Sequence, residues 1–134
     1  MTNIKDIEGV GPSYAEKLGK AGIKTTEALL KEGASAAGRK AIAEKSGVSE
    51  KQILEWVNHV DLYRIKGVGS EYSDLLEEAG VDTVPELAQR NPDHLHAKMV
   101  EVNAVKKLVR RLPLKGQVAD WVAQAKNLSR IITY

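Results

Sequence analysis

The chain of 134 residues contains no cysteine and no phenylalanine, and it has only two tryptophans. The absence of cysteine excludes disulfides, thiol catalysis and cysteine-based zinc sites. No apolar run approaches the roughly 20 residues that span a bilayer. The N-terminus also lacks the apolar core of a signal peptide. We therefore expect a cytoplasmic protein that makes no membrane contact, with a core made mainly of Leu, Val, Ile and Ala.

A strong excess of charge of one sign is also lacking. The chain has 20 basic and 18 acidic side chains, which gives a formal net charge of +2. Such a mild excess neither requires nor excludes a polyanionic partner, so the local distribution of charge must decide. A hydrophobic content of 43% and a charged content of 28% are typical of a globular protein.

What the chain does contain is an internal repeat. The stretch Ile7–Ala15 corresponds to Ile65–Ser73, which lies 58 residues later in the sequence. Across 7–30 and 65–88, ten of 24 positions are identical. This is too many for two unrelated helical segments, and an internal repeat constrains the architecture directly.

The two tryptophans extend the repeat. Trp56 and Trp121 hold matching places but lie 65 residues apart instead of 58, which predicts an insertion of about seven residues in the second repeat. Their helical spacing among apolar neighbours predicts that both indoles are buried. The repeat predicts two domains, 1–63 and 64–134.

Nearly all periodicity in the sequence is helical, and no segment alternates polar and apolar residues as a strand does. Thr25 is predicted as a helix N-cap, and two capping boxes are predicted: Ser49 with Gln52, and Thr83 with Glu86. We expect an all-α fold of two tandem five-helix units that form one helical protein.

Each repeat carries a Gly-Val-Gly turn before a helix, and these turns are the first turn (Gly9, Val10 and Gly11) and the second turn (Gly67, Val68 and Gly69). Glycine accepts positive φ and lets another molecule approach the backbone, so a valine in place of Gly11 or Gly69 is expected to strain the fold. The central valine is expected to point into the core. The helix that follows begins with N–H groups that lack partners, at the positive end of its dipole. This geometry suits a phosphate oxygen.

The pattern of Ile7, Gly9, Val10, Gly11, Ala15 and Leu18 resembles the helix-hairpin-helix signature. Members of that group bind nucleic-acid backbones without reading sequence, often in tandem pairs. Nearly the whole chain also resembles an uncharacterised bacterial family of tandem helix-hairpin-helix proteins, catalogued as a domain of unknown function. The resemblance implies a SAM-like fold for each unit and implies DNA binding, but it brings no settled activity.

The residues that follow the two turns differ in charge. Ser13 and Lys17 follow the first turn and are compatible with a phosphate contact. The helix after the second turn carries four carboxylates, which would repel a phosphate over a Debye length of about 8 Å: Glu71, Asp74, Glu77 and Glu78. We therefore predict phosphate binding at the first turn. The alternative for either turn is that its glycines only let two helices meet at a tight angle, and this alternative is favoured for the second turn.

The strongest basic cluster consists of Lys106, Lys107, Arg110 and Arg111. Asn103 is expected to cap a helix over Ala104–Leu112 that ends at Pro113. In such a helix the four cations would stack at i, i+4 on one face, opposite a buried apolar face of Val105, Leu108, Val109 and Leu112. A solvated surface is the usual meaning of this pattern, and a phosphate-facing surface is the alternative.

No catalytic or metal-binding constellation is recognisable. His59, His94 and His96 have no ligand spacing, and the acidic residues are scattered among Lys and Arg. We therefore predict a non-enzymatic protein without cofactor or metal.

Two functions stay open after the sequence is read. The preferred interpretation is sequence-independent binding of the DNA phosphate backbone through Gly9, Val10, Gly11, Ser13, Lys17, Lys106, Lys107, Arg110 and Arg111. The alternative is a helical adaptor that binds an unidentified protein and no nucleic acid, which the near-neutral charge and the acidic second repeat favour.

Overall fold

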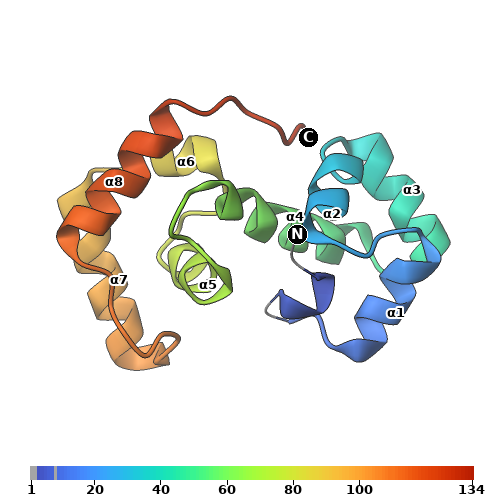
Figure 1. Cartoon of the computed structure of the whole chain (residues 1–134), viewed down its shortest axis with the longest axis horizontal. Coiled ribbons are helices and arrows are strands. Elements are labelled where there is room, and N and C mark those ends of the chain that lie inside the picture. Colours follow the sequence, from blue (N-terminus) through green and yellow to red (C-terminus); the bar gives the residue numbers. More distant parts are fainter. Residues whose placement is uncertain (1–2, 8) are drawn as a thin grey trace. The chain divides into compact units, whose positions relative to one another are not determined.

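The computed structural model describes residues 3–7 and 9–134, which fold as helices joined by short turns (Figure 1). The described residues form eight α-helices: α1 (Pro12–Lys20), α2 (Thr26–Glu32), α3 (Ala36–Ser46), α4 (Glu50–Asp61), α5 (Ser70–Glu78), α6 (Val84–Ala88), α7 (Pro92–Lys106) and α8 (Lys115–Lys126). They also form two short 3₁₀ helices, η1 (Ile4–Asp6) and η2 (Leu62–Arg64). The expected all-α class is confirmed, and an isolated bridge pairs Asn3 with Thr25.

The chain divides into two units. Unit 1 comprises Met1–Asp61 together with Ile131–Tyr134, and unit 2 comprises Leu62–Arg130. The chain therefore leaves unit 1 at the end of α4 and returns to it at Ile131. The repeat does not predict this return.

In unit 1, polar side chains fix where the helices begin. The Thr25 hydroxyl accepts from the Ala28 N–H and the Ser35 hydroxyl from the Gly38 N–H, so each satisfies a first-turn donor. The Ser49 hydroxyl accepts from the Gln52 N–H as predicted. The other half of the expected capping box does not form, and the side-chain amide of Gln52 donates to Glu55.

The core of unit 1 lies along α4, which packs against α2 and α3, while α1 packs against α3. Ile53, Trp56, Val57 and Val60 of α4 are all buried, at the three- and four-residue spacing of one helical face. Each such side chain contributes about 1.5–3 kcal/mol on burial. The predicted burial of Trp56 is confirmed.

The chain's last residues complete unit 1. Ile132 is buried, and the Thr133 N–H donates to the Ala34 carbonyl at 2.7 Å. Arg39 is itself buried, and its guanidinium donates to the carbonyls of Gly33, Ala34 and Thr133 at 2.9, 3.1 and 2.8 Å. The returning tail is therefore held by one apolar side chain and by backbone hydrogen bonds.

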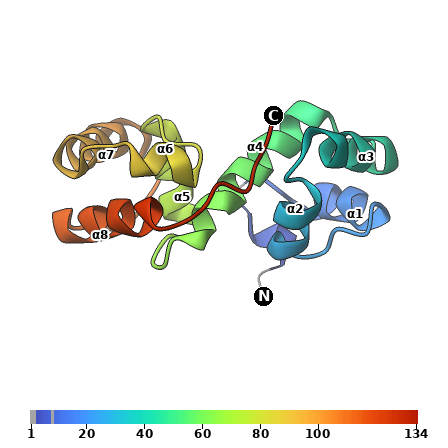
Figure 2. The ribbon, with the colours of Figure 1, turned by 90° about the horizontal axis from the view of Figure 1, so that it is seen from above.

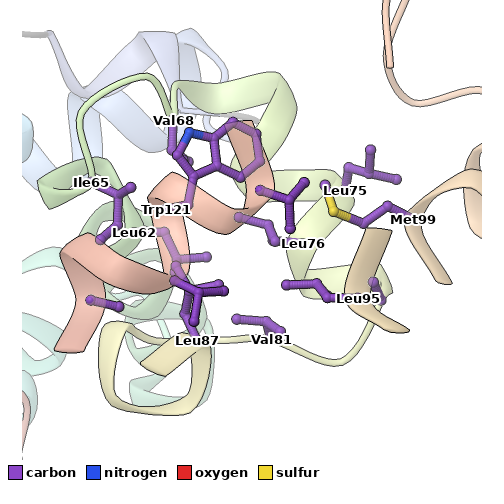
Figure 3. Packing of buried hydrophobic residues seen from close by; sticks show 14 of the residues in the cluster. Leu62, Ile65, Val68, Leu75, Leu76, Val81, Leu87, Leu95, Met99 and Trp121 are labelled. Carbon is purple, nitrogen blue, oxygen red and sulfur yellow. The ribbon is translucent and has the colours of Figure 1, made fainter. Parts of the chain in front are cut away.

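Unit 2 is built around α8, which lies alongside α7 and packs against α6 (Figures 1 and 2). Its apolar cluster contains Leu75 and Leu76 of α5 and Met99 of α7. Trp121 of α8 lies in this cluster together with Val68 of the second turn (Figure 3), which confirms its predicted burial. The buried side chain of Val68 therefore anchors the second turn to the core of unit 2.

The expected capping box at Thr83 and Glu86 is wrong. Thr83 precedes α6, but its side chain makes no capping hydrogen bond, and this residue is buried. The Glu86 carboxylate instead accepts from the Asp82 N–H at 3.3 Å and pairs with Arg90 at 3.1 Å. Arg90 also donates to the Gly80 carbonyl, so it links the α5–α6 turn to the end of α6.

The expected helix over Ala104–Leu112 is also wrong. Asn103 does not begin a helix, because it lies inside α7, which continues to Lys106. Lys107 then adopts a left-handed conformation with φ of 51°, which ends the helix. The Asn103 side chain accepts from the Val109 N–H at 3.0 Å and donates to the Val109 carbonyl at 3.3 Å. Its amide thus offers residue 109 the backbone partners that a continued helix would have supplied.

Candidate nucleic-acid interface

The first turn is anchored by its apolar residues and exposes its glycines. Ile7 and Val10 are buried, as predicted for the central valine, and the Val10 N–H donates to the Ile7 carbonyl at 3.0 Å. Gly9 and Gly11 are exposed. The Val10 amide is therefore used inside the turn, and the exposed residues on either side of it are the two glycines.

The second turn has the same construction. Ile65 and Val68 are buried, and the Val68 N–H donates to the Ile65 carbonyl at 3.1 Å. The Gln124 side chain adds a further anchor, because it accepts from the Lys66 N–H at 2.8 Å and donates to the Lys66 carbonyl at 3.1 Å. The second turn is thus fixed to α8 as well as to the core.

Positive φ is confined to the first glycine of each turn. Gly9 and Gly67 have φ of 89° and 99°, whereas Gly11 and Gly69 have φ of −87° and −106°. Gly11 and Gly69 are the N-caps of α1 and α5. The expectation that Gly11 and Gly69 need positive φ is therefore wrong: these two glycines leave space above the backbone but are not conformationally required.

An aromatic layer lies beneath each turn. The Tyr14 and Trp56 rings have centroids 5.0 Å apart, and those of Tyr72 and Trp121 are 5.3 Å apart. A Cβ added to Gly67 would lie 3.1 Å from Nε1 of Trp121. Each tyrosine therefore packs on a tryptophan, and the indole lies close behind the first glycine of the turn.

The residues after the first turn lie on α1. Ser13 and Lys17 are both exposed, one helical turn apart and just behind Gly11. The Lys17 ammonium lies 5.5 Å from the centroid of the Tyr14 ring, within range of a cation–π interaction. All of these residues belong to unit 1.

The predicted basic helix face does not exist. Lys106 is the last residue of α7, Lys107 is its left-handed C-cap, and Arg110 and Arg111 lie in the loop before α8. No i, i+4 stacking of four cations is therefore formed. The predicted buried apolar face is also wrong, since Val105 is 79% exposed while Val109 is buried.

Lys106 is also not an uncompensated cation. Its ammonium forms a salt bridge with Glu78, one of the four carboxylates after the second turn. This pair neutralises part of the negative charge on α5. Within residues 3–7 and 9–134, neither Arg110 nor Arg111 forms an ion pair, and both are exposed.

The loop arginines and the second turn meet in one groove. It is lined by Gly67, Gly69, Ser70, Glu71, Tyr72, Arg110 and Arg111. The Tyr72 hydroxyl donates to the Arg111 carbonyl at 3.0 Å, which fixes the loop against α5. This groove, called the arginine groove below, joins the backbone of the second turn with two guanidinium groups that can donate hydrogen bonds.

Of the predicted site residues, Gly67 and Gly69 are thus brought together with Arg110 and Arg111. Gly9, Gly11, Ser13 and Lys17 form a separate group in unit 1. Sequence reasoning missed the roles of Tyr72, Asn103 and Gln124 as positioning residues. The backbone partners of Tyr72 and Gln124 are 39 and 58 residues away in the sequence, and that of Asn103 is six residues away across the end of a helix, so no helical spacing pattern could reveal them.

Two further kinds of site were searched for in the part of the chain that the structure describes. None of the helices there is both long enough and apolar enough to cross a membrane. Over the same residues, His, Asp and Glu side chains nowhere gather in a group of three or more that could hold a metal ion.

Comparison with known proteins identifies a family. Residues 8–128 match the family described as Domain of unknown function (DUF4332), which covers most of the chain. The protein therefore belongs to this family. No curated protein and no solved structure gives a significant match.

Proposed function

We propose that this protein is a non-enzymatic, cytoplasmic binder of the DNA phosphate backbone that acts through two helix-hairpin-helix turns and does not read sequence. The observation that carries the proposal is the arginine groove, in which the second turn and two exposed guanidinium groups converge. The first turn, with Ser13 and Lys17, serves as a second contact of the same kind.

The chemistry of the groove fits a phosphodiester. The N-terminus of α5 places the positive end of the helix dipole at the groove, which favours an anion. Arg110 and Arg111 add planar donor groups that bind phosphate oxygens in a bidentate manner. Glu71 opposes this, but the pairing of Glu78 with Lys106 reduces the negative field behind the turn.

Binding through phosphate contacts alone is expected to be weak and to depend on salt concentration. Phosphate contacts carry no sequence information, and the affinity of such complexes lies near a Kd of about 10⁻⁴–10⁻⁶ M at physiological salt. The logarithm of affinity should fall with the logarithm of salt concentration by about 0.9 for each phosphate contact. A net charge of +2 agrees with a small number of contacts.

The test measures fluorescence anisotropy of labelled random-sequence duplexes at several KCl concentrations. Two variants probe the groove: Gly69→Ala, and Arg110→Gln combined with Arg111→Gln. A Cβ on Gly69 would meet no atom within 4 Å and would stand in front of the turn backbone. We expect each variant to weaken binding by roughly tenfold, and the double variant also to lower the salt slope.

The matched control removes the same charge elsewhere. Lys126→Gln combined with Arg130→Gln also removes two exposed cations from unit 2, but outside the groove. It should retain most of the affinity. If both double variants weaken binding equally, the groove is not the site. If the wild-type protein binds no duplex even at low salt, DNA is not the ligand and the protein–protein adaptor becomes the better interpretation.

A further inference from the structure

The α7–α8 loop, 107–114, combines cations with exposed leucines. Leu112 is 36% exposed and Leu114 is 65% exposed, and Pro113 between them is buried. Arg110 and Arg111 come directly before them in the chain. Figure 1 shows this loop at the end of α7 from which the chain turns back into α8.

The loop is held in place at several points. The Asn103 amide bonds both backbone groups of Val109, and the Tyr72 hydroxyl bonds the Arg111 carbonyl. His96 Nε2 lies 2.9 Å from the Pro113 carbonyl, and the Leu114 N–H donates to the Gln117 side chain at 2.8 Å.

The exposure of the leucines is therefore a fixed feature of the loop, not a result of fraying. Because the backbone of this loop is already held in place, covering the leucines costs little further backbone freedom. Neighbouring Val109 and Pro113 are buried, so the same backbone that hides these two presents the leucines outward.

Apolar side chains next to phosphate-binding arginines suit nucleic acid whose bases can be reached. Leucines inserted at a base step partly unstack the bases, at a cost that is lowest where pairing is already disturbed. An anionic membrane would favour an amphipathic helix with a broad apolar face and aromatic anchors. The loop is not helical, and its exposed apolar side chains are these two leucines.

We propose that Leu112 and Leu114 form a wedge that contacts bases beside the phosphates held in the arginine groove. The preferred ligand is therefore DNA with mismatched or easily unstacked bases. This inference rests on the proposed function. It assigns the arginines to backbone attachment and the leucines to preference among DNA structures.

The experiment compares a fully paired duplex with the same duplex carrying one mismatch beside a 2-aminopurine, a base whose fluorescence rises on unstacking. The wild-type protein should bind the mismatched duplex about tenfold more tightly, because a mismatch removes part of the cost of unstacking, and should raise the fluorescence. Leu112→Ser combined with Leu114→Ser should abolish both effects. The salt slope should stay unchanged, because no phosphate contact is lost.

Leu128→Ser is the matched control, since Leu128 is 37% exposed and also lies in unit 2 but outside the loop. It should keep the preference for the mismatch. Urea unfolding verifies that all variants stay folded. Equal binding of both duplexes by the wild-type protein would overturn the wedge while leaving backbone binding intact, and no binding at all would overturn both. Loss of binding to anionic vesicles in the leucine variant, with DNA binding unaffected, would assign the leucines to a membrane and overturn the wedge.

Discussion

At the scale of single residues, the two glycines of each turn have different tasks. Gly9 and Gly67 hold a backbone conformation that L-residues disfavour, and a tryptophan lies directly behind each of them. Gly11 and Gly69 hold an ordinary conformation with open space in front. The first position therefore serves the fold, and the second leaves room for a ligand.

This division predicts the effects of alanine substitution. Gly9→Ala should lower the free energy of unfolding by about 1–2 kcal/mol, the cost of a left-handed conformation with a Cβ. Gly67→Ala should cost more, because its Cβ would lie 3.1 Å from Trp121 Nε1, whereas the Cβ at position 9 would lie 3.8 Å from Trp56 Nε1. Urea denaturation followed by tryptophan fluorescence measures both.

The control for these substitutions is the second glycine of each turn. Gly11→Ala and Gly69→Ala should change stability by less than about 1 kcal/mol, since alanine is only a somewhat poorer N-cap than glycine. Equal destabilisation at all four positions would contradict positive φ as the cause, because only Gly9 and Gly67 of these four have it.

At the scale of elements, the sequence predicts most helices because their signals are local. Thr25 bonds an amide three residues away, and the buried residues of α4 follow one another at helical spacing. The α7–α8 loop was mispredicted because the decisive contacts are less local. Pro113 suggested where a helix must stop, but the helix had already ended at Lys106 through the left-handed Lys107 and the side chain of Asn103.

The candidate site was partly predictable for the same reason. The Gly-Val-Gly turns are visible as a repeated motif, and the central valines are buried as their pattern indicates. The meeting of the second turn with Arg110 and Arg111 depends on the path of a loop about 40 residues further along the chain, from 69 to 110. No spacing rule connects the two segments.

Asn103→Ala tests the account of this loop. The variant loses both side-chain hydrogen bonds to Val109, so we expect a loss of about 1–2 kcal/mol in stability. The freed segment should also exchange its amide hydrogens faster over 107–112, while α8 keeps its protection. Hydrogen exchange followed by mass spectrometry resolves the two segments.

The matched control for this prediction is Asn127→Ala. Asn127 is an exposed residue whose side chain bonds the carbonyl of Ala123 four residues earlier. It should leave exchange in the loop unchanged. Unaltered exchange over 107–112 in Asn103→Ala would mean that the hydrogen bonds of Tyr72 and His96 alone define the loop.

At the scale of the whole molecule, the last residues of the chain belong to the same unit as the first. In the sequence, unit 2 is inserted between the end of α4 and the tail 131–134, which is part of unit 1. Arg39 is central to this arrangement, because its buried guanidinium bonds carbonyls on both the α2–α3 turn and the tail. A buried cation needs such a full set of acceptors, since leaving it unsatisfied is costly.

This arrangement predicts that changes in the tail act on unit 1. Ile132→Ala should lower the stability of unit 1 by about 2–5 kcal/mol, the usual cost of shortening a buried isoleucine to alanine. Arg39→Met should also lower the stability of unit 1, because methionine keeps the apolar stem but donates to none of the three carbonyls that Arg39 binds. Hydrogen exchange should accelerate in α2 and α3 for both variants, while α6 to α8 stay protected.

Ile131→Ala is the control. Ile131 precedes Ile132 in the chain but is 38% exposed, so its truncation should be tolerated. Faster exchange spread evenly over both units in Ile132→Ala would show that the units unfold together and that the tail stabilises the chain as one cooperative body. Protection lost only within 131–134 would mean that unit 1 holds its fold without the tail. Selective loss in α2 and α3 is the result that the contacts of Thr133 with Ala34 and Arg39 require, because those contacts connect the tail to the turn between these two helices.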